Sequence, residues 1–185
     1  MDRDRIERGM QEILEGIGVD RLNPEVLANT ARRVAAMYAE FFDKIDQDPA
    51  DTLEVLYQEP YEEMIVLKDV PFFSICEHHF LPFVGTADIV YIPSDNRIVG
   101  ASKLARAVDV AASRPQLQER LTSQIADALV EKLDPQGVLV RIVATHMCMT
   151  LRGVKKPGTK MVTSAIRGSF YGDQAQREEA YALIA

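Results

Sequence analysis

The chain has 185 residues, of which 47% are apolar and 26% are charged, and its formal net charge is −7. This composition is typical of a globular domain, and it excludes a membrane-spanning helix because no run of about 18 apolar residues occurs. The acidic balance argues against nucleic acid as a partner. The first twenty residues alternate charged and apolar positions, unlike a secretory signal, so we expect a cytoplasmic protein that binds neither nucleic acid nor membrane.

The first part of the chain is predicted to be helical. Apolar residues recur at helical spacing over 6–17, and the nearby glycines are expected to end this helix. Asn23 is a suitable N-cap and Pro24 suits the first turn of a second helix. The acidic segment that follows has weak periodicity and is expected to be a connection. We therefore treat residues 1–63 as an N-terminal helical region.

From residue 64 onward the pattern alternates between strands and helices. Segments rich in β-branched residues predict strands, and apolar residues at four-residue intervals predict helices. The order is strand, strand, helix, helix, strand, strand, which favours an α+β domain with helices on one face of a mostly antiparallel sheet. Residues 64–185 are thus expected to form the sheet-containing region, and the chain is expected to be one structural domain overall. The predicted strands are 64–70, 84–93, 138–149 and 160–170, and the predicted helices are 102–113 and a segment beginning at Pro115.

All cysteine and histidine residues of the chain fall in two short segments, "CEHH" at 76–79 and "HMC" at 146–148. A single disulfide between cysteines 72 positions apart is less favoured in a cytosolic protein than free thiols or metal ligands. Cys76 and His79 have the C-x-x-H spacing of a chelating turn. Alternation along a strand places His146 and Cys148 on one face, together with Arg152 if the strand continues.

Folding could therefore join two thiols and up to three imidazoles, a donor set that favours zinc. The site would be structural with four protein ligands or catalytic with three ligands and water, and spacing alone does not say which histidines bind. Two other interpretations stay open. The residues could be ordinary core members, or Cys148 and His146 could form a nucleophile and base, which leaves Cys76 without a role.

Basic residues gather near the second cluster. Such a patch is either a solvated face or a site for a small polyanion such as a triphosphate. Ser102, Lys103 and Arg106 begin a predicted helix, where backbone N–H groups and the helix dipole favour anions. Periodicity alone predicts that Gln118 and Glu119 are solvated surface residues. Residues 141–170 contain no acid and six bases, which are Arg141, Arg152, Lys155, Lys156, Lys160 and Arg167.

Five motifs in order resemble the GTP cyclohydrolase I family: "CEHH", "GASKLAR", "RPQLQERLT", "THMCM" followed by "LRG", and "TSAIRGSF". The resemblance extends from about Leu27 to Phe170. It implies an enzyme that takes GTP and water as substrates, opens the imidazole ring of GTP, releases formate and recloses the product as 7,8-dihydroneopterin triphosphate. It also implies the tunnelling fold, with subunits joined through their sheets into a homodecamer of two stacked pentamers.

The resemblance assigns roles to individual residues. It implies a zinc ion held by Cys76, His79 and Cys148, with water in the open position, and it makes His78 and His146 the proton-transfer groups. It replaces the surface prediction for Gln118 and Glu119 with recognition of guanine. The residues that it places around the triphosphate and ribose are Arg33, Ser102, Lys103, Arg106 and Arg152.

Two further hypotheses accompany this expectation. A relative that stops after ring opening, or that accepts another purine triphosphate, would hardly differ in sequence. A binding module would keep zinc as a purely structural ion and use the basic segment to dock an acidic partner. That module predicts four protein ligands and little loss of fold when His78 or His146 is changed.

Overall fold

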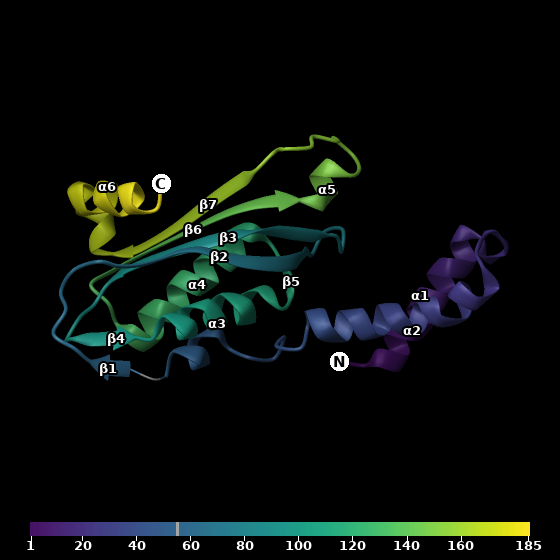
Figure 1. The fold of residues 1–185 in the computed structure, drawn as a ribbon, viewed down its shortest axis with the longest axis horizontal. Helices are drawn as coiled ribbons and strands as arrows, with labels where there is room; N and C mark the ends of the chain where they lie inside the picture. The colour runs from purple at the N-terminus through teal and green to yellow at the C-terminus, as the bar shows by residue number, and fades with distance from the viewer. Residues whose placement is uncertain (55) are drawn as a thin grey trace. The chain divides into compact units, whose positions relative to one another are not determined.

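The computed structural model describes residues 1–54 and 56–185 and contains two compact units, Met1–Asp43 and Lys44–Ala185 (Figure 1). Within the described part of the chain, no helix combines the length and apolar character that a membrane crossing needs.

The first unit is a pair of helices in contact with each other, as predicted. The Asn23 side chain accepts a hydrogen bond of 2.9 Å from the Glu25 amide, and Pro24 occupies the first turn, which confirms the N-cap. Gly18 ends the first helix with a φ of 101°, a conformation that favours glycine. The elements are α1 (Arg3–Ile17), the 3₁₀ turn η1 (Val19–Arg21) and α2 (Pro24–Phe41).

The second unit is built on a five-stranded sheet of order β5-β2-β3-β6-β7. Neighbouring strands are antiparallel except for the short β5, which runs parallel to the end of β2. A separate antiparallel pair joins β1 to β4. The strands are β1 (Leu56–Gln58), β2 (Ile65–Cys76), β3 (Pro82–Ile92), β4 (Arg97–Val99), β5 (Pro115–Gln116), β6 (Gly137–His146) and β7 (Met161–Gly168).

Helices cover the two faces of this sheet unequally (Figure 1). The long helices α3 (Ala101–Ala112) and α4 (Gln118–Leu133) bury one face in a large apolar core. The shorter α6 (Gln174–Leu183) closes a smaller core on the opposite face, because Val90 and Leu139 alternate along their strands with residues of the large core. The predicted α+β architecture is confirmed. The remaining short elements are η2 (Pro49–Leu53), α5 (Met147–Thr150) and η3 (Ser169–Tyr171).

Three boundaries differ by three residues or more from the sequence predictions. Pro115 does not begin a helix: it lies in β5, paired with Ile75 of β2, and α4 begins three residues later. The strand predicted over 138–149 ends at His146, where a single helical turn takes over. β2 also continues beyond its predicted end to reach Cys76. Each difference depends on pairing between segments that are far apart in sequence.

A buried ion pair stabilises the sheet within strands β3 and β6, away from the strand ends. Asp88 is 1% exposed and lies opposite Arg141 in the β3–β6 register, with a shortest N···O distance of 2.8 Å. Its other oxygen accepts a 2.9 Å hydrogen bond from the amide of Asp69, at an irregularity of β2. Arg141 also donates to the carbonyl oxygen of Ile184. The pair therefore joins three strands to the C-terminal segment.

Candidate active site

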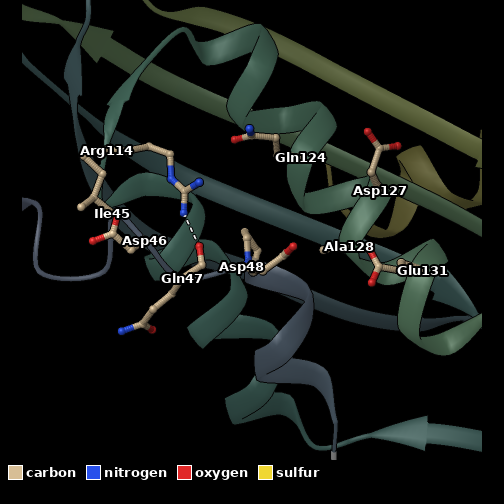
Figure 2. A pocket seen from close by; sticks show the side chains of 10 residues that line it. Ile45, Asp46, Gln47, Asp48, Arg114, Gln124, Asp127, Ala128 and Glu131 are labelled. Atoms are coloured by element: carbon tan, nitrogen blue, oxygen red, sulfur yellow. Dashed lines mark hydrogen bonds between the residues drawn. The ribbon is translucent and has the colours of Figure 1, made fainter.

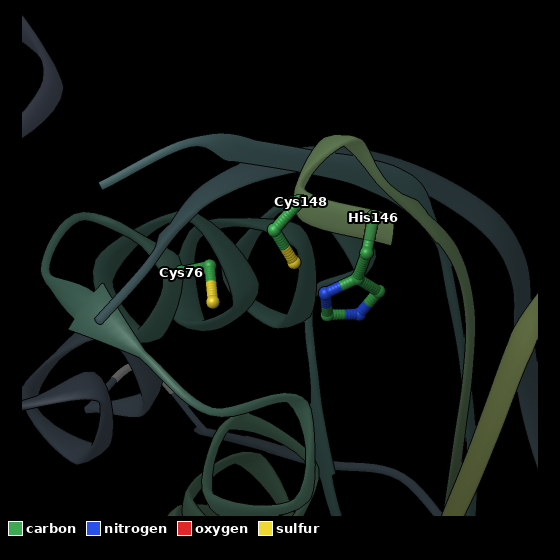
Figure 3. A group of neighbouring side chains, drawn as sticks. All are labelled: Cys76, His146 and Cys148. Atoms are coloured by element: carbon green, nitrogen blue, oxygen red, sulfur yellow. The ribbon is translucent and has the colours of Figure 1, made fainter. Parts of the chain in front are cut away.

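The two sequence clusters meet in space at one end of the sheet (Figure 3). Cys76 ends β2, His146 ends β6 and Cys148 lies in α5. One ligand atom from each residue lies within 4.8 Å of the other two. Since β2 and β6 both flank β3, the sheet order itself brings these distant segments together. Cys76 is 4% exposed, so the group sits at the margin of the core.

The route by which Cys148 reaches this group differs from the prediction. We expected His146 and Cys148 to share a strand face, but β6 has ended and Cys148 lies on the helical turn that follows. The turn still leaves the sulfur atom of Cys148 beside the His146 ring, in one group with Cys76 (Figure 3). His146 and Cys148 therefore do not share a strand face, although they lie close together as predicted.

The other two histidines lie in the exposed turn after β2 and are outside this group. The Nε2 atom of His79 is 2.9 Å from the Nη1 atom of Arg152. Because a guanidinium can only donate, His79 accepts this hydrogen bond. The ring of His78 lies beside that of His79, with centroids 6.2 Å apart. The structure thus joins His79 to Arg152 and groups His146 with the thiols.

Burial sets the ionisation of the group. Desolvation lowers the pKa of His146, and the negative charge of Glu119 partly opposes this effect. Burial, followed by the proximity of Cys76, raises the pKa of the Cys148 thiol. A neutral His146 imidazole beside a protonated Cys148 thiol is therefore favoured when nothing is bound. A divalent metal would displace thiol protons on binding.

Phe83 is a site residue that the sequence reasoning missed. Its ring stacks on that of His146, with centroids 4.5 Å apart and an interplanar angle of 2°. The two residues lie opposite each other in the β3–β6 register. The alternation of β3 was a usable signal, because it places Phe83 on the core face, where it is fully buried.

Gln118 and Glu119 begin α4 but face different surroundings. Gln118 is 1% exposed, so the prediction that it is a solvated surface residue is wrong. Its side-chain oxygen lies 2.8 Å from the Nε2 atom of His146. Glu119 is exposed, yet it is near enough to influence the charge of His146. Gln118 is thus buried against strands β6 and β7, whereas Glu119 is accessible to solvent.

The predicted phosphate-binding residues occupy separate places. Ser102, Lys103 and Arg106 lie in the first turns of α3, and the two outer members are exposed. Ser102 and Arg106 share a helix face because they are four residues apart. Arg152 lies in the loop after α5, where residues 151–160 are all exposed. Arg33 is exposed on α2 in the other unit.

A separate cavity of about 380 Å³ lies beside α4 (Figure 2). Four of its ten lining residues are acidic, and Arg114 donates a 2.7 Å hydrogen bond to the Gln47 carbonyl oxygen. None of the predicted site residues lines this cavity. The cluster of sulfur and imidazole therefore remains the candidate active site. The lining residues are Ile45, Asp46, Gln47, Asp48, Pro49, Arg114, Gln124, Asp127, Ala128 and Glu131.

Comparison with known proteins identifies the family. Residues 6–185 match the family model described as GTP cyclohydrolase I. The chain is 56% identical over 184 residues to GTP cyclohydrolase 1 of Carboxydothermus hydrogenoformans, covering 100% of this chain and 95% of that protein. The chain belongs to the GTP cyclohydrolase I family. It is also 51% identical over 184 residues to GTP cyclohydrolase 1 of Brevibacillus brevis, covering 100% of this chain and 98% of the relative.

Membership of the GTP cyclohydrolase I family confirms two of the predictions. The chain is an enzyme, and its mostly antiparallel sheet, with the long helices α3 and α4 packed on one face, is the tunnelling fold that the resemblance implied. Among solved structures, the crystal structure of the archaeosine synthase QueF-Like in the apo form aligns with a TM-score of 0.46 and 14% identity. That alignment covers 60% of this chain and 96% of the other.

Proposed function

We propose that this enzyme opens the imidazole ring of GTP, releases formate and recloses the product as 7,8-dihydroneopterin triphosphate. The proposal rests on the proximity of Cys76, His146 and Cys148, whose ligand atoms lie within 4.8 Å of one another, in a chain of this family. Ring opening and formate release are hydrolytic steps, whereas the sugar rearrangement and the reclosure, which expels water, depend on proton transfers. Ionisable groups at one place suit these steps, and no organic cofactor is needed.

The donor set suits the zinc ion that the family implies. Thiols and imidazole are ligands that zinc prefers, and the two thiols lie within 4.8 Å of each other, close enough to share one ion. We propose that Cys76, His79 and Cys148 hold zinc, and that His146 stays beside it as a proton-transfer group. When bound, zinc makes water a nucleophile at neutral pH.

Zinc content tests the choice of the third ligand. His79→Gln is expected to lose bound zinc, whereas His146→Gln is expected to keep it and lose turnover, since only the proton-transfer group is removed. If His146→Gln loses zinc and His79→Gln retains it, the imidazole that the structure groups with the thiols is the ligand instead.

We assign the proton transfers to two histidines: His146, which is grouped with the thiols, and His78, which lies outside that group. His146 has a pKa lowered by burial, so it is neutral near pH 7 and can accept a proton. His78 lies in the exposed turn after β2, where its imidazole is accessible to solvent. We propose that the two rings take up and return the protons that ring opening and reclosure move.

Substrate recognition is assigned to charge and hydrogen bonding. A carboxylate accepts hydrogen bonds from both N1–H and the 2-amino group of guanine, and the exposed Glu119 can present one. Adenine lacks this pair of donors. We propose that the triphosphate and ribose bind Arg33, Ser102, Lys103, Arg106 and Arg152.

We also propose a cytoplasmic homodecamer of two stacked pentamers. β7 lies at one edge of the sheet, and an edge strand offers backbone groups that a neighbouring chain can pair with. The cytosol keeps thiols reduced, as zinc binding by Cys76 and Cys148 requires. Light scattering tests the assembly: a mass of about ten chains of 20.7 kDa supports the decamer, and a monomer contradicts it.

The reaction itself is tested by its products. The purified, zinc-loaded protein is incubated with GTP, and both formate and the oxidised, fluorescent pterin are quantified, with ATP as the matched control. Equal amounts of formate and pterin from GTP, and neither from ATP, are expected. Formate without pterin would show an enzyme that stops after ring opening. Neither product would contradict the proposed reaction.

A further inference from the structure

The side chain of Gln118 has its amide group fully engaged within the protein. Its Nε2 atom lies 3.2 Å from the carbonyl oxygen of Ile142, 3.1 Å from that of Met161 and 3.1 Å from the hydroxyl of Thr163. Its Oε1 atom lies 2.8 Å from the Nε2 atom of His146. With a side chain only 1% exposed, the amide has no donor left for a substrate.

These neighbours settle which way the amide faces. Carbonyl oxygens only accept hydrogen bonds, so the amide nitrogen must face Ile142 and Met161. The reverse orientation would set Oε1 against two carbonyl oxygens and leave buried groups unpaired, at a cost of about 1–3 kcal/mol each. Oε1 of Gln118 therefore faces His146. Because an amide oxygen only accepts, the Nε2 atom of His146 carries the hydrogen.

The position of that hydrogen determines the other side of the ring. A neutral imidazole has one N–H group, so Nδ1 of His146 carries a lone pair. Figure 3 shows this second ring nitrogen turned toward the sulfur atoms of Cys76 and Cys148. The stacked ring of Phe83 restrains the imidazole plane.

We propose that Gln118 is a positioning residue that holds His146 in the Nε2–H tautomer, with the Nδ1 lone pair facing the thiol pair. Its side chain then does not read guanine, and selection of the base falls to the carboxylate of Glu119. The effect on turnover rests on the proposed function, whereas the tautomer does not depend on it.

The tautomer is measured by solid-state ¹⁵N NMR of the full-length chain labelled at its three histidines. Spectra are taken with and without zinc at about pH 8.5, where imidazole is neutral, and His146→Gln assigns the signals. We expect an unprotonated Nδ1 and a protonated Nε2 at His146 in both preparations. A protonated Nδ1 would overturn the proposal whether or not the protein turns over GTP.

Substitution tests the role of Gln118. Gln118→Met keeps the length of the side chain but removes the acceptor, so both tautomers of His146 are expected in the NMR spectrum. Turnover is expected to fall by about 10- to 100-fold, while KM for GTP and the preference for GTP over ATP change less than about threefold. Gln124→Met is the matched control, because it removes another amide from α4, one bonded to Gln116, and should leave both readouts unchanged.

Two results would contradict the proposal. An unchanged tautomer and an unchanged turnover number in Gln118→Met would show that the hydrogen bond does not position the ring. A large rise in KM with an unchanged turnover number would show that Gln118 contacts the substrate. If Gln118→Met does not fold, the wild-type spectrum still decides the tautomer.

Discussion

The two ends of the main sheet are made from the same strands but carry different chemistry. At one end β2 and β6 lead into the thiols and imidazole of Cys76, His146 and Cys148. At the other end the same strands carry apolar residues that pack beneath α6, and Leu139, Phe170 and Ile184 there are fully buried. The difference indicates that one end of the sheet is built for reactivity and the other for stability.

The contrast has a physical reason. At the apolar end each side chain contributes by leaving water, an effect that is insensitive to direction. At the site end the groups act through hydrogen bonds whose direction matters, as the four contacts of Gln118 illustrate. Substitutions should therefore separate activity from stability.

The largest effect is expected for Cys148→Ser at the site end. Loss of zinc removes several kcal/mol of transition-state stabilisation, so kcat/KM for GTP should fall by about 1000-fold or more. The free energy of unfolding of the zinc-free protein should change by less than about 1 kcal/mol. Metal analysis accompanies the assay, and retained zinc with abolished activity would instead support a cysteine nucleophile.

Phe170→Ala should have the opposite pattern. Removal of this fully buried ring is expected to lower the free energy of unfolding by about 3–5 kcal/mol, measured by denaturant titration. Below the unfolding transition kcat should stay within about twofold of wild type. Tyr171→Ala is the control, because Tyr171 is 68% exposed and should cost little. A fall in kcat while the protein is folded would contradict the claim that the apolar end contributes to stability and not to activity.

Asp88→Asn should have an intermediate effect on stability alone. The substitution leaves Arg141 without its charged partner, and a loss of about 2–3 kcal/mol is expected because the arginine is partly exposed. Asp95→Asn, at a side chain that is 83% exposed, is the control. A stability equal to wild type would show that the ion pair does not fasten the strands.

The smallest effect is expected for the exposed loop beside the site. Replacing Lys155 and Lys156 together by alanine should lower kcat/KM for GTP by about 2- to 5-fold at low salt, because a positive field attracts the triphosphate. The difference should vanish at about 0.5 M salt, with kcat unchanged. Lys132→Ala, in the last turn of α4, is the control. An effect independent of salt would indicate direct contact instead.

Local signals in the sequence predicted the order of the two N-terminal helices, the four long strands and the helices α3 and α4, but not the short strands or α6. The Asn23 N-cap and the glycine that ends α1 depend only on neighbours a few residues away, so they could be read directly. The clustering of cysteine and histidine was also predictable, because the chain contains few of either and all of them fall in two short segments. The alternation of strands gave the two faces of the sheet.

Long-range pairing accounts for what the sequence did not reveal. Pro115 suits a first helical turn and a short strand equally well, and only its pairing with Ile75 decides between them. The burial of Gln118 depends on acceptors in β6 and β7, more than twenty residues away. Periodicity reports which residues are apolar, but it does not report which polar residue finds enough buried partners.

Zinc titration of turnover tests the central claim most directly. The zinc-free protein is supplied with increasing zinc, and formate release from GTP is measured beside bound metal. We predict that the rate rises in proportion to bound zinc and saturates at about one ion per chain. Full formate release without zinc, or one bound zinc without formate, would contradict the assignment of the Cys76, His146 and Cys148 end of the sheet as the active site.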